Sequence, residues 1–386
     1  MHNRLSEVLT CFLFLFFSTI NYAQDSIDVS VKPYISLRGQ LAVFDKDTEL
    51  QDNVSRTGIE LKIKNKSISF IAGLEFQINM FKGNSSFNVD GNLDNGLLAI
   101  KSETKQQVLG NRLGYLGIDF NQYGKLTFGK QWGVYRDVTA YTDKFNVFGG
   151  RASATFTGGT DGGELGTGRA DQAIIYRNKI KFLHIGTQVQ TKGGNSNLID
   201  GFGLSAQVEL SKELLVGVAY NKAFINKALI DNKILGLNGN PSYFTLGSNY
   251  SSKKFDFSLV GIIQENGDFT SSNNLTENNI IPSYVFGAKG FESYFKWKME
   301  KLALSTGYNL YVPNGINKDN SQYVSDKFRK SDWIVGINYS PIKFIQLYSE
   351  QRFSFGHNSS GQKEQNIFVL GMRMDLSKQF NQSIKL

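Results

Sequence analysis

The stretch of sequence that decides the fold is residues 29–43, which read VSVKPYISLRGQLAV. Its odd positions carry mostly apolar side chains, such as Val31 and Leu37, while its even positions include Lys32 and Arg38. Successive side chains of an extended strand point to opposite faces. The stretch therefore predicts a β-strand with one apolar face and one charged face.

The same alternation recurs along the whole chain. We predict about 16 such segments, each close to the roughly ten residues that a tilted membrane strand requires. They cover 29–43, 54–64, 67–80, 111–120, 124–132, 170–178, 181–191, 200–211, 213–222, 241–250, 253–264, 283–297, 300–311, 331–340, 342–354 and 364–376. An even number of antiparallel strands closes into a barrel whose two termini lie on the same side.

The composition agrees with an all-β protein and excludes other classes. The 386 residues include 30 Phe, 17 Tyr and 39 Gly but only 5 Pro. Aromatic residues make up 13% of the chain, which is too many for a disordered protein. Beyond the N-terminal segment, no apolar run reaches the roughly 18 residues of a membrane helix. No linker or shift in composition divides the chain, so we predict one domain.

The N-terminus is predicted to be a signal peptide, residues 1–23, which precedes a barrel domain of residues 24–386. Arg4 supplies the positive start, a short apolar stretch follows, and Ala23 offers a small residue at the cleavage site. Cys11, the single cysteine, lies inside this segment. A lipid anchor on Cys11 is disfavoured because apolar residues continue after it. The mature chain would therefore contain no thiol.

Alternating strands also occur in soluble sandwiches, so the lengths of the connections are needed to distinguish a sandwich from a membrane barrel. Short connections, such as 65–66 and 340–341, alternate with long ones, such as 81–107, 133–168 and 312–330, and this is the outer-membrane pattern. Aromatic residues gather near segment ends, as an interfacial girdle requires: Tyr243, Phe244, Phe255, Phe291, Tyr294, Phe295, Trp333, Phe353 and Phe355. Closure also removes the open sheet edges that lipid does not tolerate. We therefore expect a transmembrane antiparallel β-barrel.

A more specific signature begins at residue 111. Residues 111–120 read NRLGYLGIDF, and residues 124–134 read GKLTFGKQWGV. Asp137, YTD at 141–143, FGG at 148–150, GR at 168–169 and YRN at 176–178 follow in that order. In order and approximate spacing this stretch resembles the general diffusion porins of Gram-negative bacteria, which are trimers of 16-stranded barrels. The rest of the chain agrees with that family only in pattern and length.

The resemblance implies that residues 133–168 form a third loop that folds into the barrel and narrows the pore. It also places Arg56, Arg112 and Arg169 in the family's cluster of arginines on the barrel wall. Arg38 lies on the polar face of the first strand and is a further candidate for this cluster.

The acidic residues that the family carries on the facing loop are only partly matched. Asp143 keeps its Tyr-Thr-Asp setting, whereas Val147 and Arg151 stand where acids are expected, and the loop has Asp161 and Glu164 instead. Guanidinium groups stay charged at every working pH. Fewer facing carboxylates shift the balance of the constriction toward positive charge. We therefore predict a weak preference for anions, which salt would screen.

The expected function is passive diffusion of small hydrophilic solutes and ions through the outer membrane. Two alternatives stay open: a channel specific for one solute, such as phosphate, or an adhesion protein whose loops 81–107, 223–240 and 312–330 bind a partner over a closed lumen. The expected partners are outer-membrane lipid and lipopolysaccharide, the permeating solutes, and further copies of the chain in a homotrimer latched by residues 81–107. Export makes nucleic acid an improbable partner, despite the net charge of +8.

No catalytic residue, metal site or cofactor is predicted. After processing only His184 and His357 remain, so a three-histidine metal site is impossible and a serine nucleophile has two candidate bases. The glycine-rich run at 158–168 suggests a phosphate cradle or a calcium loop, but it lacks Gly-Lys-Ser/Thr and a regular ligand spacing. We interpret it as a flexible connector that returns the loop to the wall.

The C-terminus departs from the family, in which an aromatic residue usually ends the last strand. The last predicted segment ends near Leu376, and Phe380 is the single aromatic residue among positions 377–386. Either Phe380 belongs to a longer last strand, or assembly of this protein relies on a different signal.

Overall fold

The computed structural model describes residues 26–45, 47–81, 108–150, 163–193, 198–226, 236–269, 275–276, 279–280, 284–315 and 324–385. The strands are β1 (Ser26–Phe44), β2 (Asp47–Asp52), β3 (Ser55–Asn65), β4 (Ile68–Ile78), β5 (Leu109–Asp119), β6 (Lys125–Trp132), β7 (Arg169–Ile180), β8 (Leu183–Gln190), β9 (Gly201–Glu209), β10 (Leu214–Ala223), β11 (Ser242–Ser251), β12 (Phe255–Phe269), β13 (Leu275–Thr276), β14 (Asn279–Ile280), β15 (Val285–Lys298), β16 (Leu302–Asn314), β17 (Lys330–Ile342), β18 (Ile345–Ser354), β19 (Ile367–Ser377) and β20 (Phe380–Lys385). The helices are the 3₁₀ turn η1 (Asn121–Tyr123) and α2 (Arg136–Thr139). In this described part of the chain no helix is long and apolar enough to cross a bilayer.

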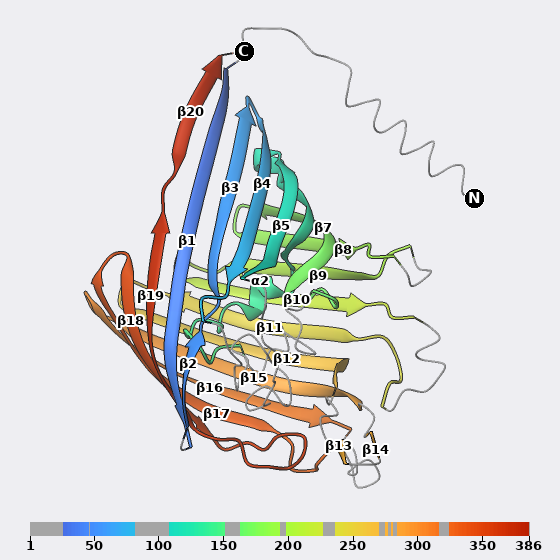
Figure 1. Cartoon of the computed structure of the whole chain (residues 1–386). Coiled ribbons are helices and arrows are strands. Elements are labelled where there is room, and N and C mark those ends of the chain that lie inside the picture. Colours follow the sequence, from blue (N-terminus) through green and yellow to red (C-terminus); the bar gives the residue numbers. More distant parts are fainter. Residues whose placement is uncertain are drawn as a thin grey trace.

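The main sheet closes on itself (Figure 1). β1 pairs with β2 and β3 along one edge and with β19 and β20 along the other, always antiparallel. β2 and β3 are two parts of one strand, as are β19 and β20, so the 18 strands of the sheet make 16 barrel strands. The predicted 16-stranded antiparallel barrel is confirmed, and the alternative of a soluble sandwich is wrong.

The two ends of the barrel differ in the length of their connections. One end carries tight turns, such as 66–67 and 181–182, and the other carries the long loops. Short turns face the periplasm in outer-membrane barrels. The signal peptide 1–23 and nearly all of the latch 81–107 lie outside the described residues, as do residues 316–323 of the loop 312–330 and residues 227–235 of the loop 223–240.

The last strand runs beyond the predicted end at Leu376. After a break at residues 378–379, β20 continues the pairing with β1, and Phe380 lies opposite Val31. Phe380 therefore belongs to the last barrel strand.

Side chains alternate between an apolar outer face and an inner face, as the pattern of residues 29–43 requires. On β1, Leu41 and Val43 are exposed on the outside, whereas Gln40 and Ala42 are buried inside the barrel. Most of the predicted girdle is exposed on the outer face: Phe244, Phe255, Phe291, Phe295, Trp333 and Phe355. The prediction is wrong for Tyr243 and Tyr294, because both are buried and pack against the inward-folded loop.

The loop that follows β6 lies inside the ring of strands, with α2 at its start (Figure 1). Val138 and Tyr141 join a buried cluster with wall residues of β10, β11 and β12. Gly247 on β11 makes room for this contact, because an added Cβ there would lie 2.9 Å from Tyr141 Cδ2 and 3.0 Å from Val138 Cγ1.

We therefore expect Gly247→Val to push α2 away from the wall. Overpacking of this kind costs about 1–3 kcal/mol. The variant should insert as a barrel but show a noisier single-channel current, because the loop is less firmly held. Gly261→Val is the matched control, since nothing lies within 4 Å of a Cβ at Gly261. Equal current noise in the two variants would contradict this packing role.

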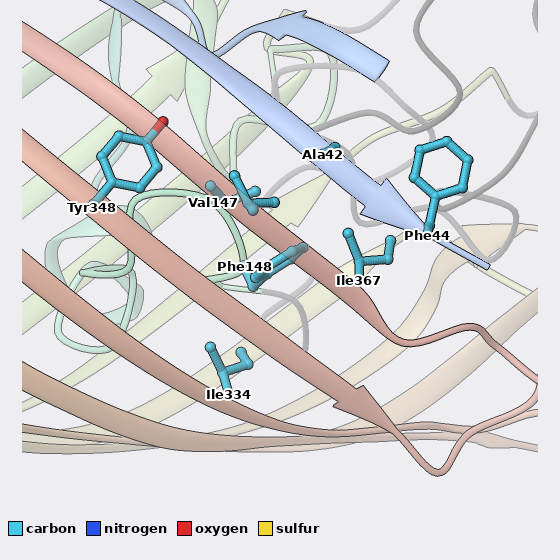
Figure 2. Close-up of a cluster of buried hydrophobic side chains, with 8 residues drawn as sticks. Ala42, Phe44, Val147, Phe148, Ile334, Tyr348 and Ile367 are labelled. Carbon is cyan, nitrogen blue, oxygen red and sulfur yellow. The ribbon is translucent and has the colours of Figure 1, made fainter. Parts of the chain in front are cut away.

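The loop continues across the lumen and docks on the opposite wall. Val147 and Phe148 pack against Phe44, Ile334 and Tyr348, together with neighbouring residues of β1 and β19 (Figure 2). This packing explains why Val147 replaces an acid, because a carboxylate in the same apolar place would lose its hydration. The prediction of an inward-folded third loop is confirmed by this arrangement.

Candidate functional site

A cavity of about 440 Å³ lies between the loop and the wall that carries the first strands. Arg38 of β1, Arg56 of β3, Arg112 of β5 and Arg169 of β7 all line it. Asp143 lines it from the loop. The structure thus brings five of the eight predicted constriction residues into one space.

Arg373 of β19 joins them and was missed in the sequence. It lies directly opposite Arg38 in the pairing of β1 with β19. Arg56 lies opposite Ser36, two residues from Arg38 on the same face of β1. Arg373, Arg38 and Arg56 therefore form a row across three neighbouring strands. The available signal was the polar face of the last strand, where Arg373 alternates with apolar residues.

Like charges directly opposite each other destabilise a sheet. Only part of the charge in this row is compensated locally. Arg373 Nε lies 2.5 Å from Asp375 Oδ2, and Arg38 Nε donates to Ser36 Oγ at 2.8 Å. Arg38 therefore has a hydroxyl, not a carboxylate, as the acceptor for its Nε.

Arg112 is the most deeply placed of the four predicted arginines, with 3% of its surface exposed. Its Nε lies 2.8 Å from Glu75 Oε1, and Tyr34 donates to the other oxygen of the same carboxylate at 2.9 Å. Glu75 was also missed in the sequence. Since Arg112 is paired in this way, its charge contributes less to the cavity than that of the half-buried row Arg373, Arg38 and Arg56.

The acid that matched the family does not face the cavity as a lone negative charge. Asp143 Oδ2 lies 2.5 Å from Arg136 Nη2 on the same loop. The Arg136 guanidinium also lies 4.6 Å from the centre of the Trp132 ring, and that of Arg169 lies 5.6 Å from it. The loop therefore contributes Arg136 and Asp143 to the cavity as an ion pair.

Two lysines also line the cavity, Lys144 of the loop and Lys296 of β15. Lys144 Nζ donates to Asn249 Oδ1 at 2.6 Å and to Ser258 Oγ at 3.0 Å. Burial lowers the pKa of the Lys144 ammonium, the carboxylate of Asp256 opposes this shift, and Lys298 and Lys296 add to it. Lys144 is thus held by neutral oxygens.

Summed over the described residues, the lining of the cavity is strongly positive. Eight cationic and two acidic side chains line it, and both acids are paired, Asp143 with Arg136 and Asp256 with Lys298 at 2.6 Å. Three of the eight cations are paired with acids: Arg112 with Glu75, Arg136 with Asp143 and Arg373 with Asp375. Near the short turns, Lys32 pairs with Glu60, Lys62 and Lys125 with Asp119, and Lys179 with Glu209. An excess of positive charge is therefore a feature of the cavity beside the loop.

One buried carboxylate holds the tip of the loop in place. Glu350 of β18 is 1% exposed and accepts the backbone N–H groups of Asn146, at 2.5 Å, and of Val147, at 2.9 Å. Asn53 donates to the carbonyl oxygen of Asn146 at 3.0 Å. Each intramolecular hydrogen bond of this kind stabilises the docked loop by about 0.5–1.5 kcal/mol. Glu350 therefore fixes the width of the cavity on this side.

The remaining predicted residues lie elsewhere. Glu164 is not part of the cavity lining and pairs with Lys192 at 2.8 Å. Arg151 and Asp161 lie outside the described residues. Residues 163–168 of the glycine-rich run bind the wall, where Gln190 donates to the carbonyl of Gly163 at 2.8 Å and Gln188 to that of Gly166 at 3.0 Å.

Three comparisons place the chain among known proteins. A family model described as Gram-negative porin matches residues 10–379. Outer membrane protein F of Serratia marcescens is 26% identical over 242 residues, which are 55% of this chain and 62% of that protein, so the match spans less than two thirds of the relative.

Two solved structures share the fold. The structure described as Salmonella typhi OmpF in complex with daunomycin aligns with a TM-score of 0.68 and 16% identity, over 90% of this chain and 97% of that chain. The anion-selective porin from Comamonas acidovorans aligns with a TM-score of 0.60 and 13% identity, over 91% of this chain and 100% of the other.

Proposed function

The chain belongs to the Gram-negative porin family, and from that premise we propose that it forms a water-filled outer-membrane channel for passive diffusion of small hydrophilic solutes and ions, with a preference for anions. The observation that carries the anion preference is the lining of the cavity beside the loop. Eight cations stand there against two acids, both of which are already paired.

The physical basis is the local concentration of counter-ions. A narrow, water-filled space bounded by protein focuses the field of its fixed charges, which raises the local concentration of anions and lowers that of cations. Arginine cannot lose its charge at working pH, so the preference does not depend on titration of the row Arg373, Arg38 and Arg56. Screening over about 8 Å at physiological salt keeps the preference moderate.

The family also suggests the setting in which the channel works. The chain would be exported with the signal peptide 1–23, would assemble as a homotrimer, and would contact outer-membrane lipid and lipopolysaccharide through its apolar outer face. The relatives are channels, so a diffusion function is a better explanation of the barrel than catalysis.

A solute-release assay tests the diffusion function. Liposomes containing the folded protein should swell in solutions of a pentose, a hexose and a trisaccharide at rates that fall with solute size and rise linearly with concentration. Liposomes that contain no protein are the control. Folded protein that admits no sugar would contradict the proposal and would favour the adhesion alternative, while a rate that saturates for one solute would favour a specific channel.

A further inference from the structure

A second cavity, of about 530 Å³, adjoins the first on its short-turn side. Arg38, Arg56, Arg373 and Trp132 line both cavities. Three guanidinium groups and one indole therefore stand at the boundary between the two spaces. A solute that passes from one cavity to the other crosses this boundary, with part of it in each cavity if it is large enough.

Two tyrosines form much of the wall of this second cavity. Tyr34 lies over Gly58 of the neighbouring strand, where an added Cβ would clash with its ring. Tyr115 lies over Gly73, where an added Cβ would come 2.6 Å from Cε1. Both tyrosines line the cavity. Each ring is thus packed on backbone on one side, which holds it flat against the wall.

Carboxylates alternate with these rings. Glu75 lies opposite Gly58 and Glu60 opposite Gly73 in the pairing of β3 with β4. Glu60, 51% exposed, is paired with Lys32 at 3.1 Å, and the side chain of Asp375 is 44% exposed. The second carboxylate oxygens of Glu60 and Asp375 can accept hydrogen bonds from a solute in the cavity.

We propose that the two cavities form one binding site for a monosaccharide that carries an anionic group. This inference rests on the proposed channel function and adds the class of solute that the channel retains during passage. The boundary arginines would bind the oxyanion, since planar guanidinium groups match phosphate and carboxylate geometry. The apolar face of the sugar ring would lie on the tyrosines, and its hydroxyl groups would donate to the carboxylates.

The dimensions and chemistry of the site both favour such a solute. Sites for small molecules usually measure about 300–1,000 Å³, and the second cavity lies within that range. A small inorganic anion would use the arginines alone and leave the aromatic wall empty. A neutral sugar would leave the arginine row unneutralised.

The test is block of the chloride current in a planar bilayer by added solutes. Glucose 6-phosphate, glucuronate, inorganic phosphate and glucose are titrated separately against the single-channel current. We expect glucose 6-phosphate or glucuronate to reach half-maximal block at a concentration about tenfold below that of phosphate, as contacts with aromatic rings can supply. The better of the two sugars identifies the anionic group, and glucose alone should not block.

Tyr115→Leu separates the contribution of the ring, because leucine still covers Gly73 but offers no aromatic face. It should raise the half-blocking concentration of the sugar anion toward that of phosphate and leave block by phosphate unchanged. Tyr123→Leu is the control, since Tyr123 is 70% exposed at a turn.

Equal block by phosphate and by both sugar anions, or equal block by glucose, would overturn the inference while leaving the channel function intact. Folded protein that carries no chloride current would instead contradict the proposed function itself.

Discussion

A channel in which Arg38, Arg56 and Arg373 are all replaced by glutamine should lose its anion preference. These three side chains form a continuous row on β19, β1 and β3, and all of them line the cavity beside the loop. Three charges acting over roughly a Debye length should change the ratio of anion to cation permeability by about tenfold. The measurement is the reversal potential in a salt gradient.

The variant should still fold, because it removes like charges that face each other across neighbouring strands. The matched control is Lys32→Gln with Lys62→Gln and Lys179→Gln, which removes the same number of charges from sites that are paired with acids. The control should keep most of the preference. If both triple variants shift the reversal potential equally, selectivity arises from the net charge of the barrel and not from the arginine row.

The second large effect is expected for Glu350→Ala. This change removes the acceptor of the backbone N–H groups of Asn146 and Val147 at the loop tip, and Glu350 itself is only 1% exposed. Leaving a buried donor such as the N–H of Val147 without an acceptor costs about 1–3 kcal/mol. We expect the loop tip to leave the wall, so the single-channel current should change in size and become noisier.

Glu350→Gln is the conservative companion of this variant. Glutamine has a side chain of the same length and keeps one acceptor oxygen, so the current of this variant should lie between those of the wild type and Glu350→Ala. The packing of Val147 and Phe148 against Phe44 and Ile334 remains in both variants and opposes release of the loop. A current indistinguishable from wild type in Glu350→Ala would show that this packing alone holds the loop.

Much of the fold could be predicted because the surroundings of a barrel wall impose an alternation of apolar and polar residues on its strands. A wall with lipid outside and water inside requires alternation at every residue, and residues 29–43 display it. Tyr243 and Tyr294 are instructive exceptions, since both strand residues lie on the inner side of the wall but pack against the loop. Local periodicity cannot reveal such packing, because the loop that covers these positions comes from elsewhere in the sequence.

The candidate site was predicted in part, for the same physical reason. Arg38, Arg56, Arg112, Arg169 and Asp143 could be proposed from their settings in the sequence. Arg373 became a neighbour of Arg38 only through closure of the first strand against the last, which depends on the register of distant strands. The pairing of Asp143 with Arg136 likewise depends on the turn of the loop around α2.

The most direct test of the central claim is the reversal potential of the wild-type channel in a planar bilayer with a gradient of potassium chloride. A lining with eight cations and two paired acids should give a potential with the sign of an anion-preferring pore, which should shrink as total salt rises. A potential with the sign of a cation-preferring pore would contradict the account.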